Sequence, residues 1–321
     1  MKTAIVTGAG GYIGYRLCQY LSEQGVKVSA ITMDRNLDLE KLKGVTVYIN
    51  PEPSFLRFQK QLFQNHADVL YHLAWCGVQS DEKNSEFVQC KNIDLCLSAM
   101  QLAKEIKCER IVVPGSAAEY AYCGETITGY NVAAPGDFYA AAKAAAHILC
   151  QQYAVQNELS LNWLIVGSVY GPGREDGNLI SYTIKSLLSG DVPVFTKLEQ
   201  KWDYLYIQDL LQALYLVGVR GVSGKTYPIG FGEARPLYWY VKTIRDLIDP
   251  SLTMEIGKLP YKNGKCPDHS VLDIRDLQKD TGFSPQVSFI DGIAKTIEYY
   301  RTLVTRRGAL QAHETLSQRP K

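Results

Sequence analysis

The chain has 321 residues, of which 46% are hydrophobic and 21% charged, enough for one large α/β unit or for such a unit with a smaller lobe. A formal net charge of +1 provides no basic field, which argues against nucleic acid as a partner. No apolar run approaches membrane-spanning length and no signal-peptide pattern is recognisable, so we expect a cytoplasmic protein that does not bind membranes.

The eight cysteines are scattered, with no CxxC pair and no Cys/His spacing typical of metal sites. We interpret them as reduced, mostly buried side chains of a cytosolic protein, and we expect no metal ion.

Short β-rich runs alternate with helical patterns through the first two thirds of the chain. The predicted strands are Thr3–Thr7, Lys27–Thr32, Val45–Ile49, Val69–Leu73, Arg110–Gly115 and Ser160–Val166. The predicted long helices are Tyr12–Gln24, Ser85–Ile106 and Tyr139–Gln156. This alternation predicts a doubly wound α/β fold of the Rossmann type, with a parallel sheet covered by helices on both faces.

The first predicted strand runs into a glycine turn and then into a helix. Gly8, Gly11 and Gly14 have the spacing in which one glycine makes a tight turn, the next lets backbone N–H groups approach a pyrophosphate, and the last packs helix against strand. The partial positive charge at the helix N-terminus also favours phosphate groups. We therefore predict a dinucleotide site at this turn, with Tyr12 and Ile13 among its residues.

The end of the second strand bears on which dinucleotide binds. An acidic residue there would receive the ribose hydroxyls and indicate NAD, but this strand ends in Thr32, followed by Met33, Asp34 and Arg35. A hydroxyl and a guanidinium suit a 2′-phosphate, so Thr32 and Arg35 favour NADP. Asp34 leaves NAD open, because it can serve the ribose itself or simply pair with Arg35.

Three residues form a candidate catalytic group. Tyr139 and Lys143 begin an Ala-rich helix and are one turn apart, so they share a face. We expect the Lys143 ammonium, with a cationic nicotinamide, to lower the pKa of Tyr139 from about 10 toward about 7. Ser116 follows the apolar strand Arg110–Val113, where open α/β sheets keep their active sites, so its hydroxyl can bind a substrate oxygen.

The strand–helix alternation breaks up after Tyr170, at the turn Gly171-Pro172-Gly173. We predict a dinucleotide-binding domain over residues 1–168, to which later segments return. A smaller, interleaved lobe over residues 169–305 is predicted to be mainly substrate-binding. The polar residues 306–321 show no periodicity and predict a flexible tail.

Further motifs make a family resemblance specific. In chain order they are Asp68-Val69-Leu70-Tyr71-His72-Leu73-Ala74, Asn92, Val169-Tyr170-Gly171-Pro172-Gly173, Asn178-Leu179, Asp203-Tyr204-Leu205-Tyr206-Ile207-Gln208-Asp209-Leu210, Tyr227-Pro228-Ile229-Gly230-Phe231-Gly232-Glu233, and Asp273 and Leu277 with Gly282-Phe283-Ser284-Pro285. With the glycine turn, the Ser116 strand and the YxxxK spacing, roughly residues 1 to 300 resemble extended short-chain dehydrogenase/reductases of the sugar-nucleotide epimerase/dehydratase family.

The resemblance implies an NAD(P)-dependent enzyme that acts on a nucleotide sugar. The catalytic trio that it implies is Ser116, Tyr139 and Lys143. The residues that it places near the cofactor are Leu73, Ala74 and Asn92. It also implies that Asn178 and the C-terminal lobe face the nucleotide sugar.

Two departures from the family narrow the reaction. The dehydratases and decarboxylases carry an acidic residue one or two positions after the catalytic Ser/Thr, where this chain has Ala117 and Ala118. Glu119 comes one position later, where the helix direction should turn it away. Elimination and decarboxylation therefore lack their acid–base group, whereas carbonyl reduction and C4 epimerisation need only the trio.

The expected substrate contacts also depart from the family. The basic residue that usually precedes Asp203 is replaced by Trp202. Lys262 and Lys265 can meet a diphosphate or belong to a solvated loop, and Trp75 and Trp202 can stack on a sugar or base or pack in the core.

The leading hypothesis is an NAD(P)H-dependent reductase of a nucleotide-linked 4-keto-6-deoxysugar. A sugar-nucleotide C4 epimerase with tightly bound NAD remains open, and a non-enzymatic dinucleotide sensor is a remote alternative. The helices Ser85–Ile106 and Tyr139–Gln156 are expected to pair with their copies in a homodimer, as is common in the family.

Overall fold

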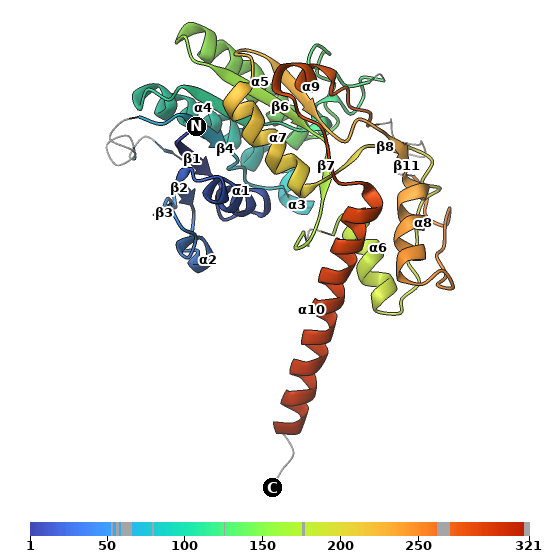
Figure 1. Ribbon diagram of the computed structural model, residues 1–321. Coiled ribbons are helices and arrows are strands. Elements are labelled where there is room, and N and C mark those ends of the chain that lie inside the picture. Colours follow the sequence, from blue (N-terminus) through green and yellow to red (C-terminus); the bar gives the residue numbers. More distant parts are fainter. Residues whose placement is uncertain are drawn as a thin grey trace.

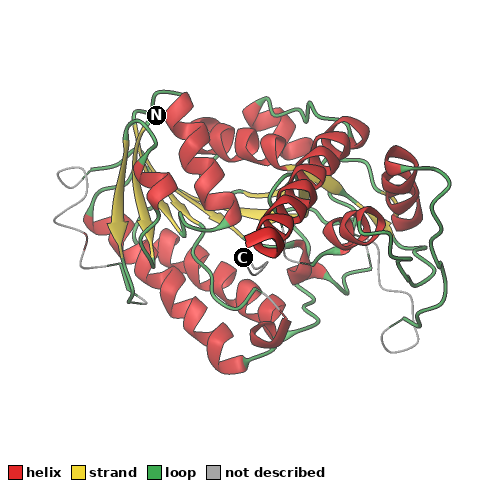
Figure 2. Ribbon diagram, turned by 90° about the horizontal axis from the view of Figure 1, so that it is seen from below, coloured by secondary structure: helices red, strands yellow, loops and turns green. Residues whose placement is uncertain are grey.

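A parallel seven-stranded sheet forms the centre of the fold (Figure 1), in the order β10-β6-β5-β4-β1-β2-β3. The computed structural model describes residues 1–52, 54–55, 58, 66–78, 80–124, 126–174, 177–261 and 270–317, without the side chains of 80–81 and 306–317. Helices cover both faces of the sheet (Figure 2), which confirms the predicted doubly wound α/β fold.

The strands of this sheet are β1 (Thr3–Thr7), β2 (Lys27–Thr32), β3 (Val45–Ile49), β4 (Val69–His72), β5 (Arg110–Pro114), β6 (Leu161–Val166) and β10 (Thr226–Ile229). The helices joined to them are α1 (Tyr12–Glu23), α2 (Leu37–Glu40), α3 (Ser80–Lys83), α4 (Glu86–Glu105), η3 (Ala117–Tyr120), α5 (Phe138–Gln156) and α7 (Ile207–Arg220). The six predicted strands and three predicted long helices agree with these bounds to within one residue at each end, as expected where glycines and polar residues flank each apolar run.

Alternate residues of the central strands enter two separate cores. In β1, Ala4 and Val6 belong to one core, whereas Ile5 belongs to the other. Helices α1 and α7 cover the first core, and α4 and α5 cover the second. Because the central strands are buried on both faces, their sequences are continuous apolar runs. Each large aliphatic side chain buried there stabilises the fold by about 1.5–3 kcal/mol.

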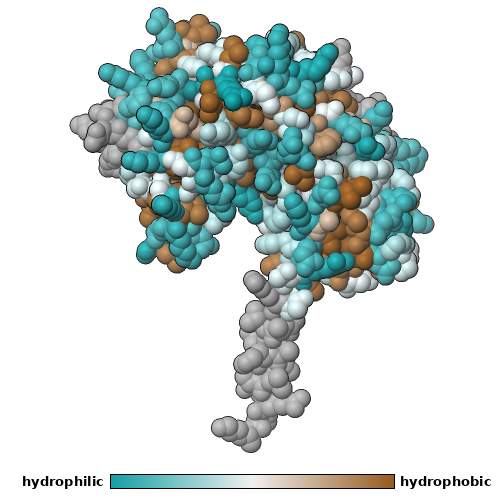
Figure 3. Space-filling model, viewed as in Figure 1, coloured by the Kyte–Doolittle hydropathy of each residue, from teal (hydrophilic) through white to brown (hydrophobic). Residues whose placement is uncertain are grey.

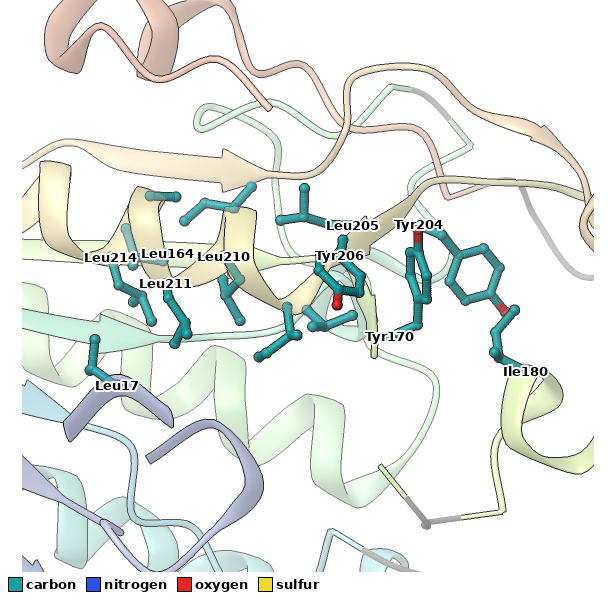
Figure 4. Packing of buried hydrophobic residues seen from close by; sticks show 14 of the residues in the cluster. Leu17, Leu164, Tyr170, Ile180, Tyr204, Leu205, Tyr206, Leu210, Leu211 and Leu214 are labelled. Atoms are coloured by element: carbon teal, nitrogen blue, oxygen red, sulfur yellow. The ribbon is translucent and has the colours of Figure 1, made fainter. Parts of the chain in front are cut away.

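The C-terminal lobe extends the first core beyond the sheet. Its elements are β7 (Ser168–Tyr170), α6 (Leu179–Leu188), β8 (Lys201–Trp202), β9 (Tyr204–Tyr206), β11 (Arg235–Pro236), α8 (Leu237–Ile248) and α10 (Phe289–Ser317), whereas α9 (Arg275–Thr281) packs on α7 and β10 of the sheet unit. Figure 4 shows Tyr170, Tyr204 and Tyr206 continuing the row of buried leucines on α7. One apolar cluster therefore spans both parts of the chain. Hydrophobic residues also gather on the visible surface of the lobe, beside α10 (Figure 3).

The sequence predicts a flexible tail over residues 306–321. Residues 306–317 continue helix α10, which extends away from the body of the fold (Figure 1), and 318–321 lie outside the described residues. Several good helix formers follow Gly308, so intrinsic propensity favours the helix where no apolar periodicity predicted one. Among the helices of the described chain, none is long and apolar enough to cross a membrane.

Candidate active site

The glycine turn between β1 and α1 has the close backbone approaches that its spacing predicted. Gly8 has a φ of +68°, and a Cβ on it would lie 2.6 Å from the backbone nitrogen of Ala74. A Cβ on Gly14 would lie 2.9 Å from Ala9 Cα and closer still to the carbonyl oxygen of Gly8. Gly11 is the N-cap of α1, without a side-chain hydrogen bond to the first turn and without an acidic residue in that turn. Bare backbone at an uncapped helix N-terminus fits a pyrophosphate.

The two residues that favour NADP lie in different settings at the end of β2. Thr32 is buried, and its Oγ1 lies where a Cβ on Gly10 would meet it. Arg35 is exposed and makes a forked pair with Glu40, at 3.1 Å from Nε to Oε1 and 3.2 Å from Nη2 to Oε2. Arg35 would have to exchange this partner for a 2′-phosphate, and a pair this exposed contributes only about 0–1 kcal/mol.

The fold brings Ser116, Tyr139 and Lys143 together at the carboxyl end of β5. Ser116 is the N-cap of the short helix η3, and its Oγ accepts a hydrogen bond from Ala118 N at 3.2 Å. The Tyr139 hydroxyl shares a hydrogen bond with Ser116. Asp137 starts α5 by accepting a hydrogen bond from Ala140 N at 2.8 Å, which places Tyr139 in the first turn of the helix. The predicted catalytic group is therefore a spatial cluster.

Lys143 is buried and held by two contacts. Its Nζ donates to the carbonyl oxygen of Pro114 at 2.9 Å and lies 3.7 Å from the ring centroid of Trp75. Burial lowers the pKa of Lys143 from 10.5 to about 8. The Trp75 ring also meets Tyr139 edge to face, with centroids 6.0 Å apart, and its Nε1 donates to Gln89. Trp75 thus packs against both Tyr139 and Lys143.

The expected effect of Lys143 on Tyr139 needs correction. In the protein alone the pKa of Tyr139 is raised, chiefly because burial disfavours the phenolate. The hydrogen bond from Ser116 and the charge of Arg174 act in the opposite direction, while the ammonium of Lys143 is directed to Pro114 and Trp75. The i,i+4 spacing set a shared helix face but not the direction of the lysine side chain.

Of the three residues expected near the cofactor, Leu73 and Ala74 directly follow β4, and Asn92 contacts the same loop from α4. Leu73 N donates to Thr7 O and Ala74 N to Thr7 Oγ1, which holds this backbone against Gly8. Asn92 is buried on α4, where its amide bonds both the N–H and the carbonyl of Cys76 at 2.8 and 2.9 Å. Asn92 therefore fixes the loop after β4, which lies against the glycine turn at Gly8.

Of the expected substrate residues, Trp75 and Ser116 follow β4 and β5, whereas Asn178 and Trp202 lie in the C-terminal lobe. Asn178 caps α6 by accepting a hydrogen bond from Ser181 N at 3.0 Å. Trp202 is partly buried, donates from Nε1 to Ser168 Oγ, and lies opposite Arg235 in the antiparallel pair of β8 and β11. Lys262 and Lys265 lie outside the described residues.

The sequence reasoning missed two cations near Tyr139. The charge of Arg174 lowers the pKa of Tyr139, and Lys83 Nζ lies 5.2 Å from the centroid of its ring. Arg174 directly follows the Gly171-Pro172-Gly173 turn, and that adjacency was the available signal. Lys83 had none, because α3 reaches Tyr139 only through the tertiary fold.

The chain matches one protein family and a curated relative over most of its length. Residues 4–230 match the NAD dependent epimerase/dehydratase family. A dTDP-glucose 4,6-dehydratase of Xanthomonas campestris is 27% identical over 331 residues, covering 94% of each chain.

Solved structures show the same fold at low identity. A UDP-N-acetylglucosamine 4-epimerase of Methanobrevibacter ruminantium has a TM-score of 0.82 at 20% identity, covering 94% of this chain and 99% of the other. A UDP-glucuronic acid 4-epimerase of Bacillus cereus, solved with NAD, has a TM-score of 0.81 at 20% identity with the same coverage. Given the family match over most of its length, the chain belongs to the NAD dependent epimerase/dehydratase family, whose members are enzymes of the extended short-chain dehydrogenase/reductase type.

Proposed function

We propose that the protein reduces the carbonyl of a nucleotide-linked 4-keto-6-deoxysugar to the 4-hydroxy product. The observation that carries the proposal is the composition of the cluster at the end of β5. Ser116, Tyr139 and Lys143 meet there, while Ala117 and Ala118 stand where a dehydratase needs its acid, and Glu119 is fully buried. This set can move one proton onto an oxygen but has no second acid–base group for elimination.

Each member of the trio has one role in this reaction. The Ser116 hydroxyl donates a hydrogen bond to the ketone oxygen and polarises it. Tyr139 supplies the proton to that oxygen as the carbonyl carbon is reduced. Lys143, buried against Trp75, binds the nicotinamide ribose and supports Tyr139. The bound nicotinamide supplies the hydride.

The cofactor of the family is NAD, and we propose that this chain prefers NADPH. The support is the absence of a carboxylate at Thr32 and the guanidinium of Arg35 three positions later. On binding NADPH, Arg35 would exchange its surface pair with Glu40 for the 2′-phosphate.

A substrate screen tests the reaction. Nucleotide-linked 4-ketosugars would be incubated with NADPH and with NADH, and oxidation of the cofactor followed by absorbance. On an active sugar, Tyr139→Phe should lose at least about 100-fold in kcat, since general acid catalysis contributes about that much or more. Tyr153→Phe, near the far end of the same helix, is the matched control and should keep full turnover. Full turnover by Tyr139→Phe would refute the assignment.

C4 epimerisation is the second candidate, because solved 4-epimerases match 94% of this chain and the trio suffices for that reaction as well. It predicts that the purified protein carries NAD and interconverts nucleotide sugars without added cofactor. Binding of a dinucleotide without turnover of any nucleotide sugar would instead favour a sensor.

We also propose a homodimer formed by α4 and α5. Both helices carry exposed apolar side chains, among them Phe87, Ile148 and Val155. A cytoplasmic location accords with the free thiols of the described cysteines.

A further inference from the structure

A buried carboxylate lies directly behind the catalytic serine. Glu119 is 0% exposed, and its Oε1 accepts hydrogen bonds from the backbone N–H of Ser116 at 2.7 Å and from Trp163 Nε1 at 3.2 Å. The first bond completes a capping box, because Ser116 Oγ bonds the backbone of η3 in return. The backbone that presents the Ser116 hydroxyl is thus fixed by Glu119.

A histidine from α5 accompanies this carboxylate. His147 Nδ1 lies 3.3 Å from Glu119 Oε2, and the ring stacks on Trp163 at a centroid distance of 4.6 Å and an angle of 4°. Its other nitrogen, Nε2, bonds Thr226 Oγ1 at 3.1 Å, and Thr226 also accepts a bond from Gln151 at 3.2 Å. Among the described residues Glu119 Oε2 has no hydrogen-bond partner, so His147 Nδ1 is a close neighbour of the carboxylate rather than a donor to it.

The end of β5 packs closely against the carboxylate and the indole. A Cβ on Gly115 would collide with both Glu119 Oε1 and Trp163 Nε1, so only glycine lets β5 end this close to the carboxylate. Trp163 itself is 1% exposed on β6. A carboxylate enclosed in this way acts through a low effective dielectric and reaches its neighbours with little screening.

The charge of Glu119 extends to the catalytic pair. The charge of Glu119 raises the pKa of Tyr139 and that of Lys143, so it favours the protonated form of both side chains. The other groups that face Tyr139 are Asp137 from its own helix, whose charge also raises the pKa, and the cations Arg174 and Lys83.

We propose that Glu119, bonded to Trp163 Nε1 and packed beside His147, is a positioning residue that fixes the Ser116 backbone and acts on Tyr139 through Ser116. Its catalytic part rests on the proposed function, because a reductase needs Tyr139 as an acid. The carboxylate stays in the core and contacts Ser116 through backbone, so it acts on substrate only through Ser116 and Tyr139.

Titration of Tyr139 tests the proposal without any substrate. The protein would be labelled with ¹³C at the tyrosine ζ carbon, and the Tyr139 signal assigned by its loss in Tyr139→Phe. Glu119→Gln keeps an oxygen for Ser116 N and Trp163 Nε1 but removes the charge, so the titration midpoint of Tyr139 should fall. Glu105→Gln, on the exposed side of α4, is the matched control and should leave the midpoint unchanged. A fall of less than about 0.3 pH unit in Glu119→Gln would overturn the proposal.

A second measurement covers the case in which Glu119→Gln does not fold. In the unsubstituted protein, labelled with ¹⁵N at tryptophan, the Trp163 indole proton should resonate downfield and exchange slowly, because it donates to a buried carboxylate. Trp163→Phe assigns the signal. An indole proton with the shift and exchange of a solvent-bonded tryptophan would refute the cluster.

Kinetics separate this inference from the proposed function. On a reduced ketosugar, Glu119→Gln should move the alkaline limb of kcat to lower pH, with KM unchanged, by as much as the Tyr139 midpoint moves. A loss of kcat that is equal at every pH would mean a merely structural role and would contradict the proposal. If no ketosugar is reduced, the Tyr139 titration still decides whether Glu119 acts on Tyr139, and the indole signal still decides whether the buried cluster forms.

Discussion

Substitution of Gly14 by alanine tests how tightly the cofactor turn is built. The new Cβ would lie 2.9 Å from Ala9 Cα, inside the 3.0 Å limit of real Cβ contacts, and nearer still to Gly8 O. Both obstacles are backbone atoms, so α1 must move relative to β1. Overpacking of this kind costs about 1–3 kcal/mol, and we take the upper end because no side chain can rotate away.

The same movement should weaken dinucleotide binding. A shift of α1 displaces the N–H groups of its first turn, and losing one hydrogen bond to a charged group costs about 1.5–3 kcal/mol. We therefore expect a Kd for NADPH that is about 10- to 100-fold higher, together with a Tm about 4–5 °C lower. Titration calorimetry and thermal unfolding measure the two effects.

Gly25→Ala is the matched control, because its Cβ would meet nothing within 4 Å but its φ of +75° strains any L side chain. It should cost about 1–2 kcal/mol of stability and leave dinucleotide affinity unchanged. Dinucleotide binding by Gly14→Ala within about threefold of the unsubstituted protein would refute the reasoning, as would equal weakening by Gly25→Ala.

Three further predictions follow from the described contacts. Burial lowers the pKa of Lys143 from 10.5 to about 8, so between these pH values the unfolded chain binds more protons than the folded one. Lys143 should therefore make the free energy of unfolding rise with pH across that window, by about 3 kcal/mol in total. Denaturant unfolding of Lys143→Met should lack this rise, and the same pH dependence in both proteins would contradict the prediction. Arg35→Ala should raise KM for NADPH about tenfold or more and leave KM for NADH unchanged, and equal changes would exclude a role in 2′-phosphate binding. Sedimentation should show a dimer that Ile148→Glu dissociates, because Ile148 is 63% exposed on α5, and a monomer of the unsubstituted protein at working concentration would refute the dimer.

Local patterns in the sequence predicted the elements and the residues of the trio. The strand–turn–helix unit from Thr3 through Gly14 depends on contiguous residues, so its apolar run and glycine spacing are legible without the fold. The position of Ser116 at the end of β5 and the common face of Tyr139 and Lys143 follow from strand length and helix period in the same way.

Contacts between distant segments were decided only by the tertiary structure. Trp75 lies against Lys143, and Glu119 meets Trp163 and His147, because β4, β5, β6 and α5 are neighbours in space. Arg35 likewise pairs with Glu40 rather than with Asp34. A long side chain chooses among several partners according to distance and burial, and neither quantity exists in the sequence until the sheet order has brought the strands together. The sequence by itself predicted Ser116, Tyr139 and Lys143 at the end of β5, and the packed fold decided which side chains surround them.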